Sequence, residues 1–255
     1  MLMLVLSPSK TMDFSRTSVM KNYTIPSFLK ESQELIDILK QISVTDLMKL
    51  MKLSSSLAEL NHERHQSWRV PFPEEKSRPA IFAFKGDVYE GLRAENFTVS
   101  DLEFSMKHLR ILSGLYGLLR PLDLMMPYRL EMNTNLKNSQ GKNLYKFWGD
   151  KITDEINKSM KEQGIHYLVN LASTEYFKAI NQKLINVPVV SPVFIEKDHG
   201  RNTIVGIHTK KARGMMTHYI ISNRITDAED IKSFDRDGYQ FDPKNSTELT
   251  WFFSR

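Results

Sequence analysis

Two of the three arginines in the stretch 109–132, near the middle of the chain, lie close to its two carboxylates. Arg120 and Arg129 could bind an anionic group, while Asp123 and Glu131 could donate or accept protons. Glycines and prolines interrupt what is otherwise a helical pattern of apolar residues. The segment therefore predicts polar groups presented from a packed base. The carboxylates fit acid–base work and a purely orienting role equally well.

A second polar cluster is expected directly after the first buried strand. Leu2–Leu6 is a continuous apolar run, typical of a strand buried on both faces, and the turn residues Ser7-Pro8 end it. Ser9 and Lys10 then follow just beyond the strand. In open α/β sheets, ligands usually bind in loops at the carboxyl ends of strands. The same residues also fit an ordinary capped turn with an exposed lysine.

The run 78–84 predicts another strand, and it places Lys85 and Asp87 at a strand end as well. If these ends meet, their polar groups could form one pocket for a small phosphorylated or anionic substrate. Such a pocket would make the protein an enzyme. The candidates for its catalytic groups are Lys10, Lys85, Asp87, Asp123 and Glu131.

The most one-sided charge distribution lies between Asp198 and Asp227, where there is no carboxylate. Five cations fall in this window: Arg201, Lys210, Lys211, Arg213 and Arg224. A helix is predicted over 210–224, so three of the cations would lie at its N-terminus, where the macrodipole disfavours each by about 0.3–1 kcal/mol. A bound phosphate would offset that cost. A solvated basic surface is the alternative.

Helices are expected over 27–40, with Ser27 as the cap, and over 43–68, where a break divides the region into a helical hairpin. Ser54 and Ser55 lie in its turn. The amides and hydroxyls there could hold a phosphate at the start of the second helix. A simple helix pair packed on the core is the other interpretation.

The rest of the chain alternates between helical and strand patterns. Helices are predicted at 101–112, 144–163, 174–180 and 210–224, and strands at 167–171, 189–195, 203–208 and, as a final edge strand, 249–253, with a turn at 198–200. This order predicts an α/β fold with a mixed central sheet covered by helices. No linker composition divides the chain, so we expect one domain over 1–255.

Composition excludes several classes of site. The 255 residues carry a formal net charge of +5 and include no cysteine. The lack of cysteine rules out disulfides and thiolate chemistry and fits a reducing cytosol. No apolar run reaches the roughly 18–20 residues of a membrane helix, and the N-terminus lacks the basic region of a signal peptide. His62 and His65 lack the spacing of a zinc protease motif. We expect no metal and no cofactor.

Seven motifs, in order along nearly the whole chain, resemble the bacterial YaaA family of peroxide stress proteins. They are SPSKT at 7–11, FKGDVY at 84–89, SGLYGLLRPLDL at 113–124, PYRLEM at 127–132, FWGD at 147–150, NLAS at 170–173 and KKARG at 210–214. The resemblance implies a cytoplasmic α/β protein that limits oxidative damage and is associated with lower intracellular free iron. It also implies DNA binding through a positively charged cleft and a helix-hairpin-helix element.

Transferred to this sequence, the resemblance assigns the helix-hairpin-helix element to about 43–68. Hairpins of this type commonly carry glycine in the turn, whereas this turn has serines. The DNA- or phosphate-binding residues would be Ser9, Lys10, Ser54, Ser55, Lys85, Arg120, Arg129, Lys210, Lys211 and Arg213. We expect recognition of DNA backbone and shape rather than sequence, a monomer, and no catalysis.

Overall fold

The centre of the fold is a mixed β-sheet with the strand order β4–β3–β1–β6–β7–β10–β9, and β8 pairs beside β7. The computed structural model describes residues 1–15, 22–198 and 201–255. The strands of this sheet are β1 (Leu2–Leu6), β3 (Leu109–Ser113), β4 (Gly117–Leu119), β6 (Tyr167–Leu171), β7 (Val189–Asp198), β8 (Arg201–Thr203), β9 (Gln240–Phe241) and β10 (Thr250–Ser254). A separate two-stranded sheet joins β2 (Arg78–Pro79) and β5 (Leu124–Met125). The predicted fold class is confirmed.

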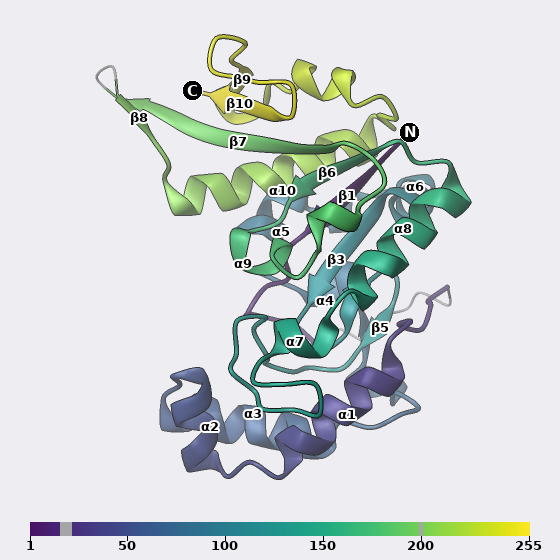
Figure 1. The fold of residues 1–255 in the computed structure, drawn as a ribbon, viewed down its shortest axis with the longest axis vertical. Coiled ribbons are helices and arrows are strands. Elements are labelled where there is room, and N and C mark those ends of the chain that lie inside the picture. Colours follow the sequence, from purple (N-terminus) through teal and green to yellow (C-terminus); the bar gives the residue numbers. More distant parts are fainter. Residues whose placement is uncertain (16–21, 199–200) are drawn as a thin grey trace.

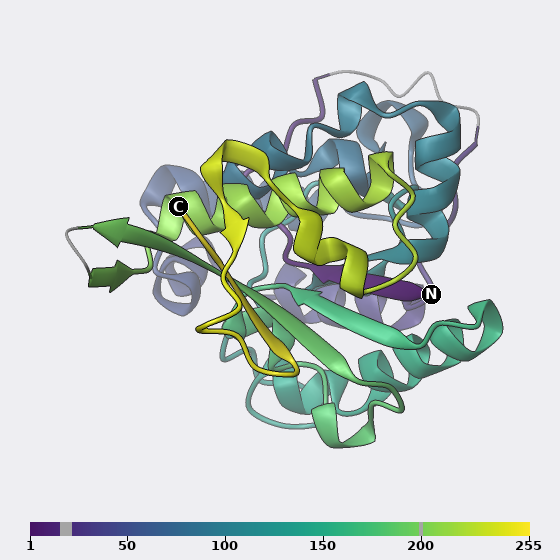
Figure 2. The same ribbon diagram turned by 90° about the horizontal axis from the view of Figure 1, so that it is seen from above.

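Helices cover both faces of the sheet and its lower end. The α-helices are α1 (Leu29–Lys40), α2 (Val44–Met51), α3 (Ser55–Ser67), α4 (Ala80–Ala83), α5 (Asp87–Leu92), α6 (Val99–His108), α7 (Leu144–Trp148), α8 (Lys151–Gln163), α9 (Thr174–Phe177) and α10 (Gly206–Ser222). Helices α6 and α10 lie on one face and α8 on the other, as Figures 1 and 2 show. Helices α1 to α3 gather beyond the carboxyl ends of β1 and β3 (Figure 1). No helix in the described ranges is long and apolar enough to cross a membrane.

The expected strand at Leu2–Leu6 is confirmed as the interior strand β1. It pairs in parallel with β3 on one side and β6 on the other, so that Leu4 lies opposite both Leu109 and Val169. All five of its side chains are fully buried. Because parallel strands end at the same edge, the loops after β1, β3 and β6 meet at the end of the sheet that faces α1 to α3.

The predicted strand over 78–84 is wrong beyond its first two residues. After β2 the chain turns into the single helical turn of α4. Its first two amides donate to carbonyls across the fold, Ala80 N to Asp123 O at 2.9 Å and Ile81 N to Pro121 O at 3.0 Å. A short apolar run has the same composition in a buried strand and in a buried helix, so tertiary contacts decide between them.

The predicted helix over 101–112 ends early. Thr98 and Asp101 form a capping box that starts α6, and α6 stops at His108. The next five residues, which are all buried, form β3 instead. The stretch 109–132 is therefore not an interrupted helix. It consists of β3, β4, β5 and their loops.

Other predicted boundaries shift by a turn or less. Helix 144–163 is split at Gly149, which has a positive φ of 50°, and Phe28 rather than Ser27 occupies the N-cap of α1. Helix 174–180 shortens to α9. The expected strand 249–253 is present as β10, but it is not an edge strand, because β9 pairs beyond it.

The predicted hairpin near 189–208 is present with a shorter return strand. Glu196 lies opposite Thr203 in antiparallel pairing between β7 and β8. The strand ends at Thr203 because α10 begins at Gly206 and takes the residues that follow. The predicted turn at 198–200 lies partly outside the described residues.

A glycine at the end of β3 brings two parts of the polar segment together. A Cβ atom on Gly114 would overlap the carbonyl oxygen of Leu130, so only glycine permits the observed backbone approach. Trp148 closes the other side by donating from its indole Nε1 to the Gly114 carbonyl at 3.0 Å. This contact fixes the neighbouring residues Arg129 and Glu131 at the carboxyl end of the sheet.

Candidate nucleic-acid interface

Helices α2 and α3 form the predicted helical hairpin. Helix α2 ends at Lys52, which adopts the left-handed conformation with φ 53° and donates its backbone N–H to Met48. Leu53 is buried beneath the turn, and Ser54 caps α3 by accepting from the N–H of Leu57 at 3.4 Å. A lysine in this conformation costs about 1–2 kcal/mol, a cost that glycine would avoid. The turn between the two helices forms nevertheless, with serines at positions where hairpins of this type commonly have glycine.

The N-terminus of α3 is open to solvent. Ser54, Ser55 and Ser56 are all exposed, and the first turn of the helix contains no acidic residue. The first backbone N–H groups of any helix have no partner within the helix, and the macrodipole gives this end a partial positive charge. The hairpin turn therefore presents backbone amide donors of the kind that hold a phosphate oxygen, while the Ser55 hydroxyl donates to Glu59 Oε1 at 2.9 Å.

Next to the hairpin, Lys10 and Arg129 converge on Glu131. The Lys10 Nζ lies 3.4 Å from Glu131 Oε1, and the Arg129 Nη2 lies 3.0 Å from the same oxygen. The Lys10 side chain remains 65% exposed, whereas that of Glu131 is only 10% exposed. The carboxylate thus sits below the two cations and holds them in place.

A cavity of about 330 Å³ connects this ion cluster to the hairpin. Lys10, Arg129 and Glu131 line one side, Lys52 lines the other, and the polar residues 133–135 complete the wall. We call this surface, together with Ser54 and Ser55, the hairpin cleft. Its three cations and one carboxylate give the cavity lining a net charge of +2.

The loop after β1 is held rigidly at the rim of the hairpin cleft. The Ser7 Oγ accepts from the Ser173 N–H at 2.8 Å, and the Tyr89 hydroxyl donates to the Ser7 carbonyl at 3.1 Å. Burial raises the pKa of Tyr89 well above its usual value, so its proton stays on this hydrogen bond. Ser9 accepts from the Thr11 N–H at 3.2 Å. These serines position the loop that carries Lys10.

Lys85 and Asp87 lie near this loop but face other partners. Lys85 is exposed and lines a separate cavity of about 410 Å³ with Asp13 and Arg78. Asp87 begins α5, and its carboxylate lies 3.7 Å from the Nζ of Lys210. The loop of Lys85 is tied to that of Lys10, because the Lys85 N–H donates to the Thr11 carbonyl at 2.9 Å.

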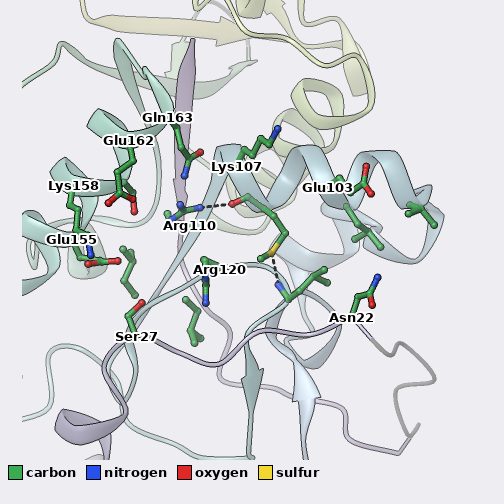
Figure 3. A pocket seen from close by; sticks show the side chains of 17 residues that line it. Asn22, Ser27, Glu103, Lys107, Arg110, Arg120, Glu155, Lys158, Glu162 and Gln163 are labelled. Carbon is green, nitrogen blue, oxygen red and sulfur yellow. Dashed lines mark hydrogen bonds between the residues drawn. The ribbon is translucent and has the colours of Figure 1, made fainter.

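Arg120 and Asp123 form a pair on another part of the molecule. Asp123 is 1% exposed and accepts from the Arg120 Nε at 3.1 Å and from the Thr24 hydroxyl at 2.6 Å. Arg120 lines a cavity different from those of Lys10 and Lys85, shown in Figure 3. The structure therefore does not bring Lys10, Lys85 and Arg120 together in one pocket for a small anionic substrate.

The three basic residues at 210–213 are not at a helix N-terminus, which corrects the sequence-based prediction. Helix α10 begins at Gly206, so these residues lie in its second turn, where the N–H groups are already used. Lys210 is exposed, Lys211 is partly exposed, and burial lowers the pKa of Arg213. The anion argument from the macrodipole therefore no longer applies to them.

Sequence reasoning missed two cations that the structure makes prominent. Lys52 is one of many lysines in amphipathic helices, and only the left-handed turn aims it at the hairpin cleft. Arg110 occupies an apolar run, LRILS, and is 3% exposed. A single arginine inside an apolar strand was the available signal, because such residues are rarely buried without a reason.

Comparison with known proteins covers all of these regions. A family model described as "Peroxide stress protein YaaA" matches residues 1–245. A UPF0246 protein of Hahella chejuensis is 50% identical over 254 residues, which cover 100% of this chain and 99% of that protein. A UPF0246 protein of Marinomonas sp. is 50% identical over 251 residues, covering 98% of this chain and 96% of that protein.

Proposed function

The chain belongs to the YaaA family of peroxide stress proteins, and from this premise we propose that it limits peroxide damage by binding DNA through the hairpin cleft. One observation carries the proposal: the open N-terminus of α3 adjoins a cavity lined by Lys10, Lys52 and Arg129. Backbone amides at a helix start and flexible cations beside them are the usual partners of nucleic-acid phosphates.

The recognition we propose is of backbone and shape. The side chains around the turn of α3 are short hydroxyls, which reach a phosphate but not a base edge in a groove. Glu131 keeps Lys10 and Arg129 in position while the hairpin cleft retains its net positive charge. Binding of this kind neutralises phosphates and releases counterions, so it weakens steeply with salt.

The proposal is tested by fluorescence anisotropy with duplex and bubble-containing DNA across a salt series. Each phosphate contact contributes about −0.9 to the slope of log affinity against log salt, so Lys10→Ala/Lys52→Ala should make the slope shallower by about 2. Lys161→Ala/Lys183→Ala is the matched control, because both residues are exposed and outside the hairpin cleft. An unchanged slope in the first pair, or no DNA binding by the wild type, would contradict the proposal.

A second variant separates the hairpin from general charge. Ser55→Asp places a carboxylate at the N-terminus of α3, where it stabilises the helix but repels a phosphate. We expect the thermal midpoint to stay the same or rise while DNA affinity falls about tenfold or more. Ser55→Asn has nearly the same shape without the charge, and it should bind almost as the wild type does. Equal affinities for the two variants would remove the hairpin from the interface.

The proposed role extends to lower intracellular free iron in a cytoplasmic setting, as the family resemblance implies. Cells lacking the protein, complemented with the wild type or with Ser55→Asp, should be compared for survival in peroxide and for chelatable iron. We expect the variant to rescue neither. Iron control retained by a variant that no longer binds DNA would separate the two activities.

A further inference from the structure

A third cavity, of about 640 Å³, lies between α6 and α8 (Figure 3). Two arginines, Arg110 and Arg120, enter it from β3 and from the loop after β4. Leu102, Leu118 and Leu122 supply an apolar wall. We call it the arginine cavity. Its volume is typical of sites that enclose a small organic molecule, for which about 300–1,000 Å³ is usual.

Arg110 is the unusual member of this cavity. Its side chain is almost fully buried, and its Nη1 donates to the carbonyl oxygens of Met106 at 2.9 Å and Leu109 at 2.8 Å. The amide of Gln163, turned so that its oxygen accepts, lies 3.0 Å from Nη2. Within the described ranges, no carboxylate lies within 4.0 Å of this guanidinium. The direct partners of this buried charge are neutral acceptors, while the carboxylates of Asp123 and Glu155 act on it from farther away, which is a costly arrangement.

The neighbouring charges do not offset the cost of burying the Arg110 guanidinium. Burial and the nearby Arg120 lower the pKa of Arg110 to about 10, against the raising effect of Asp123 and Glu155, and the group remains charged at neutral pH. Arg120 is already paired, with its Nη2 3.0 Å from Asp123 Oδ1. Within the described ranges, Arg120 therefore has a carboxylate within 4.0 Å and Arg110 has none. Four cations and three carboxylates line the cavity, namely Lys107, Arg110, Arg120 and Lys158 with Glu103, Glu155 and Glu162. The lining keeps one net positive charge, which a bound oxyanion would offset.

We propose that the arginine cavity binds a small organic oxyanion, a carboxylate or a phosphate monoester carried on an apolar body, with Arg110 as its anchor. A planar guanidinium matches either oxyanion by two parallel hydrogen bonds. The leucine wall would bury the apolar body of the ligand and remove it from water, which favours binding. This site is independent of the proposed DNA interface, because no residue lines both cavities.

The test uses three probes of similar size: benzoate, phenyl phosphate and the uncharged benzamide. Binding is measured by saturation-transfer NMR and by calorimetric titration of the full chain. We expect the anions to bind saturably and benzamide at least tenfold more weakly. The ratio between benzoate and phenyl phosphate then identifies which oxyanion the site prefers. Absence of saturable binding of both anions, or equal binding of benzamide, would overturn the proposal.

Variants locate the site. Arg110→Met removes the charge while keeping much of the length, and it should weaken anion binding at least tenfold. Lys161→Gln removes an exposed cation from the same side of the molecule and should change nothing, since Lys161 does not line the cavity. If Arg110→Met does not fold, Ser159→Phe decides, because Ser159 lines the cavity and a phenyl ring there fills it. Anion binding retained by folded Arg110→Met or by Ser159→Phe would contradict the assignment.

Discussion

The hairpin cleft and the arginine cavity are both lined by more cations than carboxylates, but they differ in exposure. The Lys10 side chain is 65% exposed and tethered only at its tip, whereas Arg110 is 3% exposed and held by backbone carbonyls. Exposed cations suit a large polyanion that stays mostly in solvent, because they adjust to it and are screened by salt. A buried guanidinium suits a small ligand that must enter and lose its water.

The two regions share one structural support, the strand β3. Arg110 lies near its start, and Gly114 follows its end and contacts the Leu130 backbone beside the hairpin cleft. The difference between the regions therefore arises from the layers around β3. Helices α6 and α8 enclose one end, whereas the α2–α3 turn leaves the other end open.

The largest effect is expected from Gly114→Ala, which should remove the distinction by damaging both regions. The new Cβ would overlap the Leu130 carbonyl, and overpacking of this kind against backbone costs about 1–3 kcal/mol or more. Chemical denaturation should show the loss of stability. Gly206→Ala is the control, because nothing lies within 4 Å of a Cβ there, and it should leave the free energy of unfolding within about 0.5 kcal/mol of the wild type.

The second-largest effect is expected from low pH, which should destabilise the hairpin before the region around β3. Burial lowers the pKa of His65, on α3 beside Arg129, to about 4 from a usual value of 6.5. Between these values the unfolded chain binds a proton that the folded chain excludes. Stability is therefore complete above pH 6.5 and falls by up to about 3 kcal/mol as the pH drops towards 4.

Hydrogen exchange, corrected for intrinsic rates, would locate that loss. Amides of α3 should lose protection between pH 7 and 5 before those of β3 do. His65→Gln should flatten the pH dependence, and His166→Gln, at an exposed position, should leave it unchanged. Equal loss of protection in α3 and β3 would show that the hairpin has no separate response to acid.

A crossed comparison of variants sharpens the contrast at a smaller scale. Lys10→Ala/Lys52→Ala should weaken DNA binding about tenfold or more and leave phenyl phosphate affinity within about twofold. Arg110→Met should do the reverse, because the two sets of residues line different cavities. Parallel titrations of DNA and phenyl phosphate on both variants measure it. Loss of both ligands in either variant would merge the two regions into one site.

The smallest effect is expected from Glu131→Gln. The change removes one negative charge from below Lys10 and Arg129, so the hairpin cleft becomes more positive. DNA affinity at low salt should rise about two- to fivefold, and the difference should shrink as salt is added. Glu74→Gln, an exposed carboxylate elsewhere, is the control. A loss of affinity in Glu131→Gln would mean that positioning of the two cations outweighs repulsion of phosphate.

The sequence predicted the elements whose signals are local. Leu2–Leu6 was identified from a continuous apolar run, the hairpin from the break that places Ser54 in its turn, and the end of α8 from the helical pattern that stops at 163. In each case a physical requirement of the backbone or of burial is met by residues next to one another in the chain. Such requirements do not depend on distant partners.

The errors occurred where distant contacts decide. The runs 80–83 and 109–113 are both short and apolar, yet the first is helical and the second is a strand, because their amides meet different carbonyls. The predictions for the site show the same division between local signals and distant contacts. Lys10, Arg129 and Glu131 converge, as their motifs suggested, whereas Arg120 points into a cavity whose walls come from α6 and α8.

The interior position of β1 has a consequence for the synthesis of the protein. Leu2–Leu6 pairs with residues 109–111 and 167–171, so its partners leave the ribosome more than a hundred residues later. Until then, five apolar residues have no strand beside them, and such unpaired edges invite aggregation. Contacts so distant in sequence also slow folding. Pairing of β1 on both sides must therefore wait for β6, and the nascent chain depends on shielding of its first strand for most of its synthesis.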